Sequence, residues 1–139
     1  MNKNKIASGV NWDSHKRQLA TLANKCEKLS RLLTRLKYPT CACGCGRRTT
    51  DWCHAISRHV EFLKYHPQNT FGMFHECHLA IDHAPDKLAK MDALMCRLIG
   101  RDEWQDLKIS ASVPYTPTIV FYSGMIEILH KAINEANNE

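Results

Sequence analysis

The sequence lacks any long hydrophobic run. No stretch of 18 or more apolar residues occurs among its 139 residues, which excludes a membrane span. Its first 16 residues are polar and lack the apolar core of a secretory signal, so we expect a cytoplasmic location. In that reducing compartment, the seven cysteines point to metal binding or packing rather than to disulfides.

Acidic residues are scarce in the first third of the chain. Residues 1–48 hold 11 Lys and Arg against two acidic residues, a net charge of +9, whereas the remainder holds 8 against 12, a net charge of −4. A basic segment beside an acidic one suggests a polyanionic partner for the first and metal ligands from the second. A solvated basic helix without a partner is the alternative, and charge alone does not separate the two.

Glycine and proline are absent from residues 12–38, which predicts a long helix after a flexible tail over 1–11. A stripe of apolar residues spaced three and four apart should pack within the same domain, although a homodimer through the helix of residues 19–36 is the alternative. On another face, Lys28, Arg31 and Arg35 could follow phosphates. The stripe consists of Leu19, Leu22, Cys26, Leu29, Leu33 and Leu36.

The remaining elements predict an α+β fold that is mostly helical, organised as a single domain. We divide it into a basic N-terminal tail and helix (1–39), a central core (40–109), and a linker with a C-terminal helix (110–139). We expect a knuckle at 40–50, a strand within 49–56, an irregular connection over 57–74, and helices at 75–83, 85–99, 102–107 and 118–137.

Five of the seven cysteines and six of the eight histidines lie between positions 41 and 83. The three cysteines Cys41, Cys43 and Cys45 alternate with Ala42 and Gly44, and Gly46 follows them. Such a turn directs backbone N–H groups toward a metal-bound thiolate. Cys77 is the natural fourth donor, and zinc prefers these ligands, so we predict a structural Zn²⁺ site.

A second group of polar residues suggests a catalytic ion. On a strand, Asp51 and His54 would point to opposite faces, so a metal held by Asp51 and a base at His54 could flank a phosphodiester. On the later helix, His78 and Asp82 share a face and His83 is one step round. Carboxylates with imidazoles suit Mg²⁺, Mn²⁺ or Zn²⁺.

The spacing of these residues resembles that of a known family. His54-Ala-Ile-Ser-Arg58 is followed by Lys64, Asn69 and then Cys77-His78. With the knuckle before it, the segment from position 41 to about 107 resembles the HNH endonucleases, most closely the NinG/Rap family of phage recombination nucleases. For a phage-encoded chain, the cytoplasm would be that of the host.

The resemblance implies a small treble-clef (ββα-metal) core that hydrolyses DNA phosphodiesters, with branched or recombination DNA as one substrate class. His54 would be the general base, and Asn69 would brace the loop and orient that histidine. His78, with Asp82 or His83, would bind the catalytic metal. The residues implied to contact DNA are Arg58 and Lys64 near the cut, with Arg47 and Arg48 on the knuckle if DNA passes over it.

Three departures from the family pattern affect the zinc ligands. Phe74 replaces the first cysteine of the second pair, Cys53 replaces the glycine before the base, and the knuckle holds a third cysteine. Cys43, Cys53 or His75 would then supply the missing ligand, unless zinc is lost. Two other hypotheses stay open: a non-catalytic zinc-finger module that binds DNA or serves as an adaptor, and a dimeric structural protein.

Overall fold

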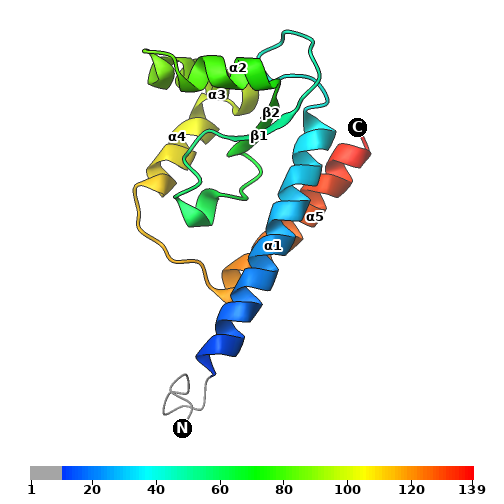
Figure 1. The fold of residues 1–139 in the computed structure, drawn as a ribbon, viewed down its shortest axis with the longest axis vertical. Helices are drawn as coiled ribbons and strands as arrows, with labels where there is room; N and C mark the ends of the chain where they lie inside the picture. Colours follow the sequence, from blue (N-terminus) through cyan, green and yellow to red (C-terminus); the bar gives the residue numbers. More distant parts are fainter. Residues whose placement is uncertain (1–10) are drawn as a thin grey trace.

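The computed structural model describes residues 11–139, so the tail expected over 1–11 lies outside the described residues except for Asn11. Two long helices, α1 (Trp12–Lys37) and α5 (Ile119–Asn137), lie side by side and form the long axis of the molecule (Figure 1). The sheet and the three shorter helices gather on one side of this pair. The expected class, α+β and mostly helical, is confirmed.

Helix α1 begins where the Asn11 side chain accepts hydrogen bonds from the backbone N–H groups of Asp13 and Ser14. It ends two residues before Pro39. Its apolar stripe packs on α5 in one cluster, as predicted for packing within the domain. Since α5 covers the stripe, dimerisation through it has no support. The buried members of the cluster are Cys26, Leu33, Tyr65, Tyr122, Met125, Leu129 and Ile133.

The sheet consists of two antiparallel strands, β1 (Asp51–His54) and β2 (Thr70–Met73). Their register places Asp51 opposite Met73 and His54 opposite Thr70. The prediction that residues 57–74 are irregular was therefore wrong at positions 70–73. All four residues of β2 are buried, so the strand has no alternation of polar and apolar side chains for sequence analysis to detect.

Three helices follow the sheet: α2 (His75–Asp82), α3 (Lys87–Ile99) and α4 (Arg101–Ala111). A short 3₁₀ helix, η1 (Glu61–Leu63), lies in the connection between the strands. Helix α4 begins at Arg101 and extends to Ala111, so the linker before α5 is shorter than predicted. The second core joins these helices to the sheet, and its buried members include Phe71, Met73, Met95, Trp104 and Leu107.

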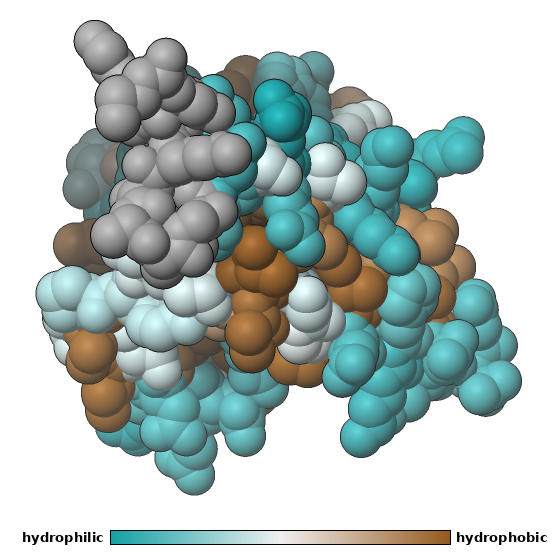
Figure 2. Space-filling model, turned by 90° about the horizontal axis from the view of Figure 1, so that it is seen from below, coloured by the Kyte–Doolittle hydropathy of each residue, from teal (hydrophilic) through white to brown (hydrophobic). Residues whose placement is uncertain are grey.

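The end of the molecule at which α1 starts exposes hydrophobic side chains between hydrophilic ones (Figure 2). Exposed hydrophobic residues in α1 and in the segment from the α4–α5 linker into α5 include Trp12, Val113, Tyr115 and Val120. None of the helices within residues 11–139 is both long enough and apolar enough to cross a membrane.

Candidate metal centres and active-site cavity

The knuckle before β1 is a tight turn that brings three thiols together. The Cys41 N–H donates to the Arg47 carbonyl over 2.7 Å, and the Gly44 N–H donates to the Cys41 carbonyl over 3.0 Å. Gly44 and Gly46 have φ angles of +87° and +83°, a conformation that disfavours side chains. The Ala42 N–H donates to Gly72 in β2 over 2.8 Å, which fixes the knuckle on the sheet.

Four sulfur atoms meet beside this turn, because Cys77 on α2 faces the three knuckle cysteines. The Sγ–Sγ distances are 3.3 Å for Cys41–Cys43, 3.7 Å for Cys43–Cys77 and 3.8 Å for Cys45–Cys77. All four atoms lie within 4.8 Å of one another. A zinc ion with Zn–S bonds of about 2.3 Å needs ligand sulfurs about 3.8 Å apart, so this group fits a tetrahedral Zn²⁺.

Among the four cysteines, Cys45 has surroundings that favour the thiolate, whereas desolvation raises the pKa of Cys43 and Cys77. A hydrogen bond from the Arg47 backbone N–H lowers the pKa of Cys45 to about 7. The two residues considered as substitute ligands lie elsewhere. Cys53 is buried in the core, where desolvation raises its pKa to about 12, and His75 faces Asp51. No substitute is needed, because all four predicted cysteines converge.

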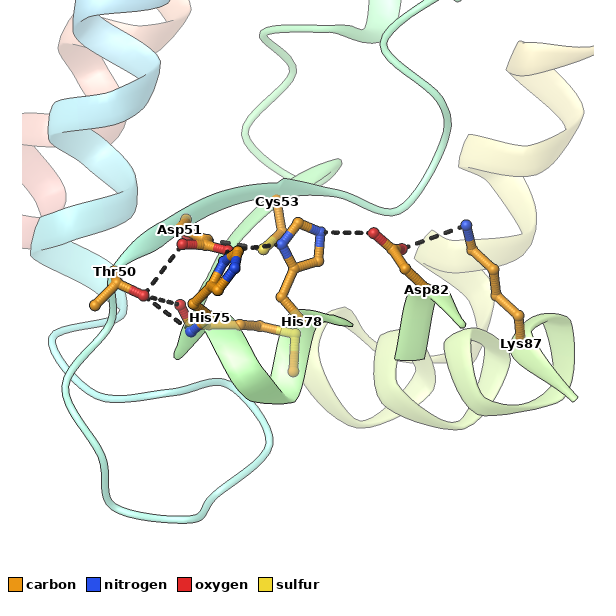
Figure 3. Close-up of polar contacts among 8 residues, drawn as sticks. Thr50, Asp51, Cys53, His75, His78, Asp82 and Lys87 are labelled. Carbon is orange, nitrogen blue, oxygen red and sulfur yellow. Dashed lines mark hydrogen bonds and ion pairs between the residues drawn. The ribbon is translucent and has the colours of Figure 1, made fainter. Parts of the chain in front are cut away.

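A second group of ligand atoms surrounds the Asp51 carboxylate at the start of β1 (Figure 3). Its Oδ2 lies 2.8 Å from His75 Nδ1 and 2.8 Å from His78 Nδ1, and Thr50 Oγ1 donates to its Oδ1 over 3.1 Å. Burial raises the pKa of Asp51, but the hydrogen bonds from His78, His75 and Thr50 outweigh it and hold this pKa below its ordinary value. One carboxylate and two imidazoles suit a divalent cation.

Asp82 lies on the outer side of His78. Its Oδ2 is 3.2 Å from His78 Nε2, and its Oδ1 is 3.3 Å from Lys87 Nζ (Figure 3). A carboxylate at the outer nitrogen of a ligating histidine orients the ring and selects its tautomer. In this geometry, Asp82 positions His78 and does not belong to the three-residue group.

Of the four residues predicted to hold the catalytic ion, the structure brings two into this group. Asp51 and His78 lie in the group, Asp82 lies behind it, and His83 is an exposed residue that ends α2. His75 takes the third position. The signal was present in the sequence, because residues three and four apart share a helix face and His75, His78 and Asp82 follow that spacing.

His54, at the end of β1, has the properties of a proton acceptor. Its Nε2 lies 2.8 Å from the Lys64 carbonyl oxygen, which can only accept, so Nε2 carries the proton and Nδ1 keeps its lone pair. Burial lowers the pKa of His54 to about 4, and the charges of Arg58, Lys64 and Arg31 act in the same direction. The imidazole is thus neutral at physiological pH.

Asn69 is completely buried and holds the loop between the strands. Its Oδ1 accepts from the Ile56 N–H over 2.6 Å, and its Nδ2 donates to the carbonyls of Ile56 (3.2 Å) and Leu63 (2.9 Å). This loop carries Lys64, whose carbonyl oxygen fixes His54. These hydrogen bonds join Asn69 to two points of the loop that the family resemblance expects it to brace.

One cavity of about 750 Å³ brings most of the predicted residues together. His54 lines it with Asp51, His78 and Asp82, and the predicted DNA contacts Arg58 and Lys64 line it too. The cavity lining does not include His83, Arg47 or Arg48. Arg47 instead pairs with Glu76 over 3.3 Å and lies 4.9 Å from the centre of the Phe74 ring.

Helix α1 supplies part of the cavity that sequence reasoning did not anticipate. Trp52 lies on β1, and its Nε1 donates to Ser30 Oγ on α1 over 3.1 Å. The Arg31 guanidinium lies 4.4 Å from the centre of the Trp52 ring, and this ring lies 4.4 Å from that of His54. Arg31 thus reaches the cavity from a helix distant in sequence.

Comparison with known proteins gives no relative from which a role could be transferred. No family model, curated protein or solved structure matches this chain.

Proposed function

We propose that this chain is a metal-dependent endonuclease of the HNH type that hydrolyses phosphodiester bonds in DNA. The observation that supports it most is one cavity lined by both a neutral, oriented imidazole and part of a carboxylate–imidazole group. The succession of knuckle, β1, β2 and α2 supports the treble-clef ββα-metal core that the family resemblance implies. Branched or recombination DNA is the substrate class that the family resemblance suggests.

His54 would act as the general base. Its Nδ1 would take a proton from the attacking water while Nε2 stays bonded to the Lys64 carbonyl. With its pKa lowered to about 4, the His54 imidazole is unprotonated at neutral pH and can accept a proton, while the same shift makes it a weaker base than an ordinary histidine. Asn69 would act on the same step as a positioning residue, since it holds the loop that carries Lys64.

Asp51, His75 and His78 would hold the catalytic divalent ion, for which Mg²⁺, Mn²⁺ and Zn²⁺ are candidates. Their ligand atoms all lie within 4.8 Å of one another, so the group fits a single cation. When bound, such an ion stabilises negative charge on the phosphoryl oxygens and the leaving group. Arg58 and Lys64, which line the same cavity, would bind the phosphate.

The four cysteines would hold a structural Zn²⁺ that joins the knuckle to α2. This ion would fix the start of α2, from which His75 and His78 extend toward Asp51. The same cysteine group supports the second candidate function, a non-catalytic zinc module that binds DNA. A module that only binds DNA does not need a neutral histidine beside a second group of metal ligands. The presence of both features favours the enzyme.

Cleavage assays with defined DNA shapes test the proposal. Supercoiled plasmid, linear duplex and four-way junction are incubated with purified protein in buffer with Mg²⁺, with Mn²⁺ or without an added cation. We expect cleavage only when a cation is added. DNA binding without cleavage under all three conditions would instead support the zinc module.

A further inference from the structure

A second, smaller cavity adjoins the first along α1. Its volume is about 100 Å³, and it shares Arg31, Thr50, Asp51 and Trp52 with the large cavity. The residues that line only the small cavity are Thr34, Arg35 and Thr49. Four shared residues make the two spaces neighbours in one depression, which extends from His54 toward the C-terminal part of α1.

Arg31 stands at the junction of the two cavities and is held in place. Its guanidinium lies over the Trp52 ring at 4.4 Å, and its Nε is 3.6 Å from Glu27. Trp52 is itself fixed by its hydrogen bond to Ser30. A cation restrained in this way loses little conformational entropy when it binds an anion.

Arg35 follows Arg31 by four residues and lies on the same face of α1. Four residues advance an α-helix by about 6 Å, a length comparable to one step between neighbouring phosphates of a nucleic acid strand. The two guanidiniums therefore present two positive charges with a spacing that suits a polynucleotide backbone, and Arg groups bind phosphate through paired hydrogen bonds.

Two hydroxyl groups at the small cavity lack partners. Thr34 is 3% exposed, and among the described residues its Oγ1 and that of Thr49 are the buried side-chain oxygen or nitrogen atoms without a hydrogen bond. Buried hydroxyls are ordinarily paired. A change of χ1 rotamer would turn the Thr34 hydroxyl, because threonine on a helix populates two rotamers.

We propose that α1 is a phosphate-binding element, in which Arg31, where the two cavities join, and Arg35, in the small cavity, bind two successive phosphates of the strand. This inference rests on the proposed function, because it takes the phosphate at His54 as the reacting one. It identifies the substrate as a polynucleotide, with the strand extending along α1. Lys28, which belongs to the same basic group in the sequence, lines neither cavity.

Salt-dependent binding tests the inference. Binding of fluorescein-labelled single-stranded and duplex DNA is measured by fluorescence anisotropy at several salt concentrations. All proteins carry His54→Ala, so that the DNA stays intact. Each lost phosphate contact makes the slope of log affinity against log salt less negative, by about 0.9 on duplex and about 0.7 on single strands. We expect Arg31→Gln with Arg35→Gln, which removes two such contacts, to make the slope less negative by about 1.8 on duplex and about 1.4 on single strands, and to weaken binding.

The matched control removes two exposed positive charges elsewhere, with Arg101→Gln and Lys131→Gln. These two residues line neither cavity, so their removal should leave the slope within about 0.3 of the parent value. The inference would be overturned if the slope did not change in the Arg31 and Arg35 variant, or if it changed equally in the control. It would also be overturned if the parent did not bind DNA.

A separate assay distinguishes this failure from failure of the proposed function. Bis(p-nitrophenyl) phosphate has one phosphodiester and no neighbouring phosphate for Arg35 to bind. If protein with native His54 does not hydrolyse this ester or DNA with Mg²⁺ or Mn²⁺, the nuclease proposal fails. The salt slopes then still decide whether α1 binds phosphates.

Discussion

His54 and His78 border the same cavity, yet their surroundings give the two imidazoles different chemistry. His78 has a carboxylate at each nitrogen, Asp51 at Nδ1 and Asp82 at Nε2. His54 has a carbonyl at Nε2 and positive charges around it. The first arrangement suits a metal ligand with an outer carboxylate, and the second suits a neutral base.

The burial of neutral His54 should make stability depend on pH. Its pKa is about 4 in the folded chain against an ordinary value of 6.5, so between these values the unfolded chain binds a proton that the folded chain does not. The free energy of unfolding should therefore be constant above about pH 6.5 and decrease below it. We expect no more than about 1 kcal/mol per pH unit, because His54 keeps some contact with solvent.

Urea denaturation of the wild type and of His54→Gln at pH 7.5, 6.5 and 5.5 checks this expectation. If the four cysteines hold zinc, its release at low pH would affect both proteins equally, so the difference between them isolates His54. The wild type should lose more stability than the variant between pH 6.5 and 5.5. Parallel losses in the two proteins would show that His54 is solvated like an ordinary histidine.

At the scale of single residues, the sequence predicts which residues belong to the site better than it predicts which residues they contact. The spacing of His54, Asn69 and His78 was sufficient to select three residues that the structure places in or around one cavity. Helical spacing puts His75 on the same face as His78, but it does not reveal that this face meets Asp51. The choice of ligands depends on where Asp51 lies, and only the pairing of β1 with β2 determines that position.

The knuckle and α2 are two separate elements that a metal would join. Cys41, Cys43 and Cys45 come from the turn, and Cys77 comes from α2, 32 residues after Cys45. A bound Zn²⁺ would close this loop, and structural zinc contributes on the order of 10 kcal/mol to folding in small domains. The helix that carries His75 and His78 should therefore depend on the metal.

Replacing one sulfur ligand tests this dependence. Cys77→Ser should lose the stoichiometric zinc of the wild type, as measured by elemental analysis, and its thermal midpoint should fall. Cys96→Ser is the matched control, because Cys96 is an exposed cysteine on α3 outside the cluster. A wild type free of zinc after expression with added zinc, or equal zinc in Cys77→Ser, would contradict the assignment.

Among the elements, long helices could be predicted and the sheet only in part. The residues of α1 and α5 repeat with helical spacing over 26 and 19 residues, which gives a strong signal. Strand β2 has four residues, all buried, and includes Gly72. At Gly72 an added Cβ would lie 2.5 Å from Thr49 Cγ2, so close packing explains a glycine that in the sequence resembles a turn.

In the whole molecule, the first and last helices pack together as one unit. α1 packs along α5, and α1 also reaches the cavity through Ser30 and Arg31. The segments that the sequence divides into 1–39 and 110–139 are therefore adjacent in space. Residue spacing identifies the apolar stripe, but it does not reveal that the partner helix lies at the other end of the same chain.

The α1–α5 contact should contribute strongly to stability. Leu129 is fully buried between the helices, and truncating a buried leucine typically costs about 2–5 kcal/mol, so Leu129→Ala should be strongly destabilised in urea. The neighbouring Ile128 is 51% exposed, and Ile128→Ala should change stability by less than about 1 kcal/mol. Similar effects of the two substitutions would contradict the packing of α5 on α1.

The central claim is that His54 removes a proton from water in a cavity that also holds a divalent cation. The most direct test is single-turnover cleavage of DNA with Mg²⁺ or Mn²⁺ by the wild type and by His54→Ala, with zinc content and DNA affinity measured for both. Loss of a general base typically costs about 10² to 10⁴ in rate, so His54→Ala should bind DNA and zinc normally and cleave at least about 10² times more slowly. Cleavage by His54→Ala at the wild-type rate would contradict the claim.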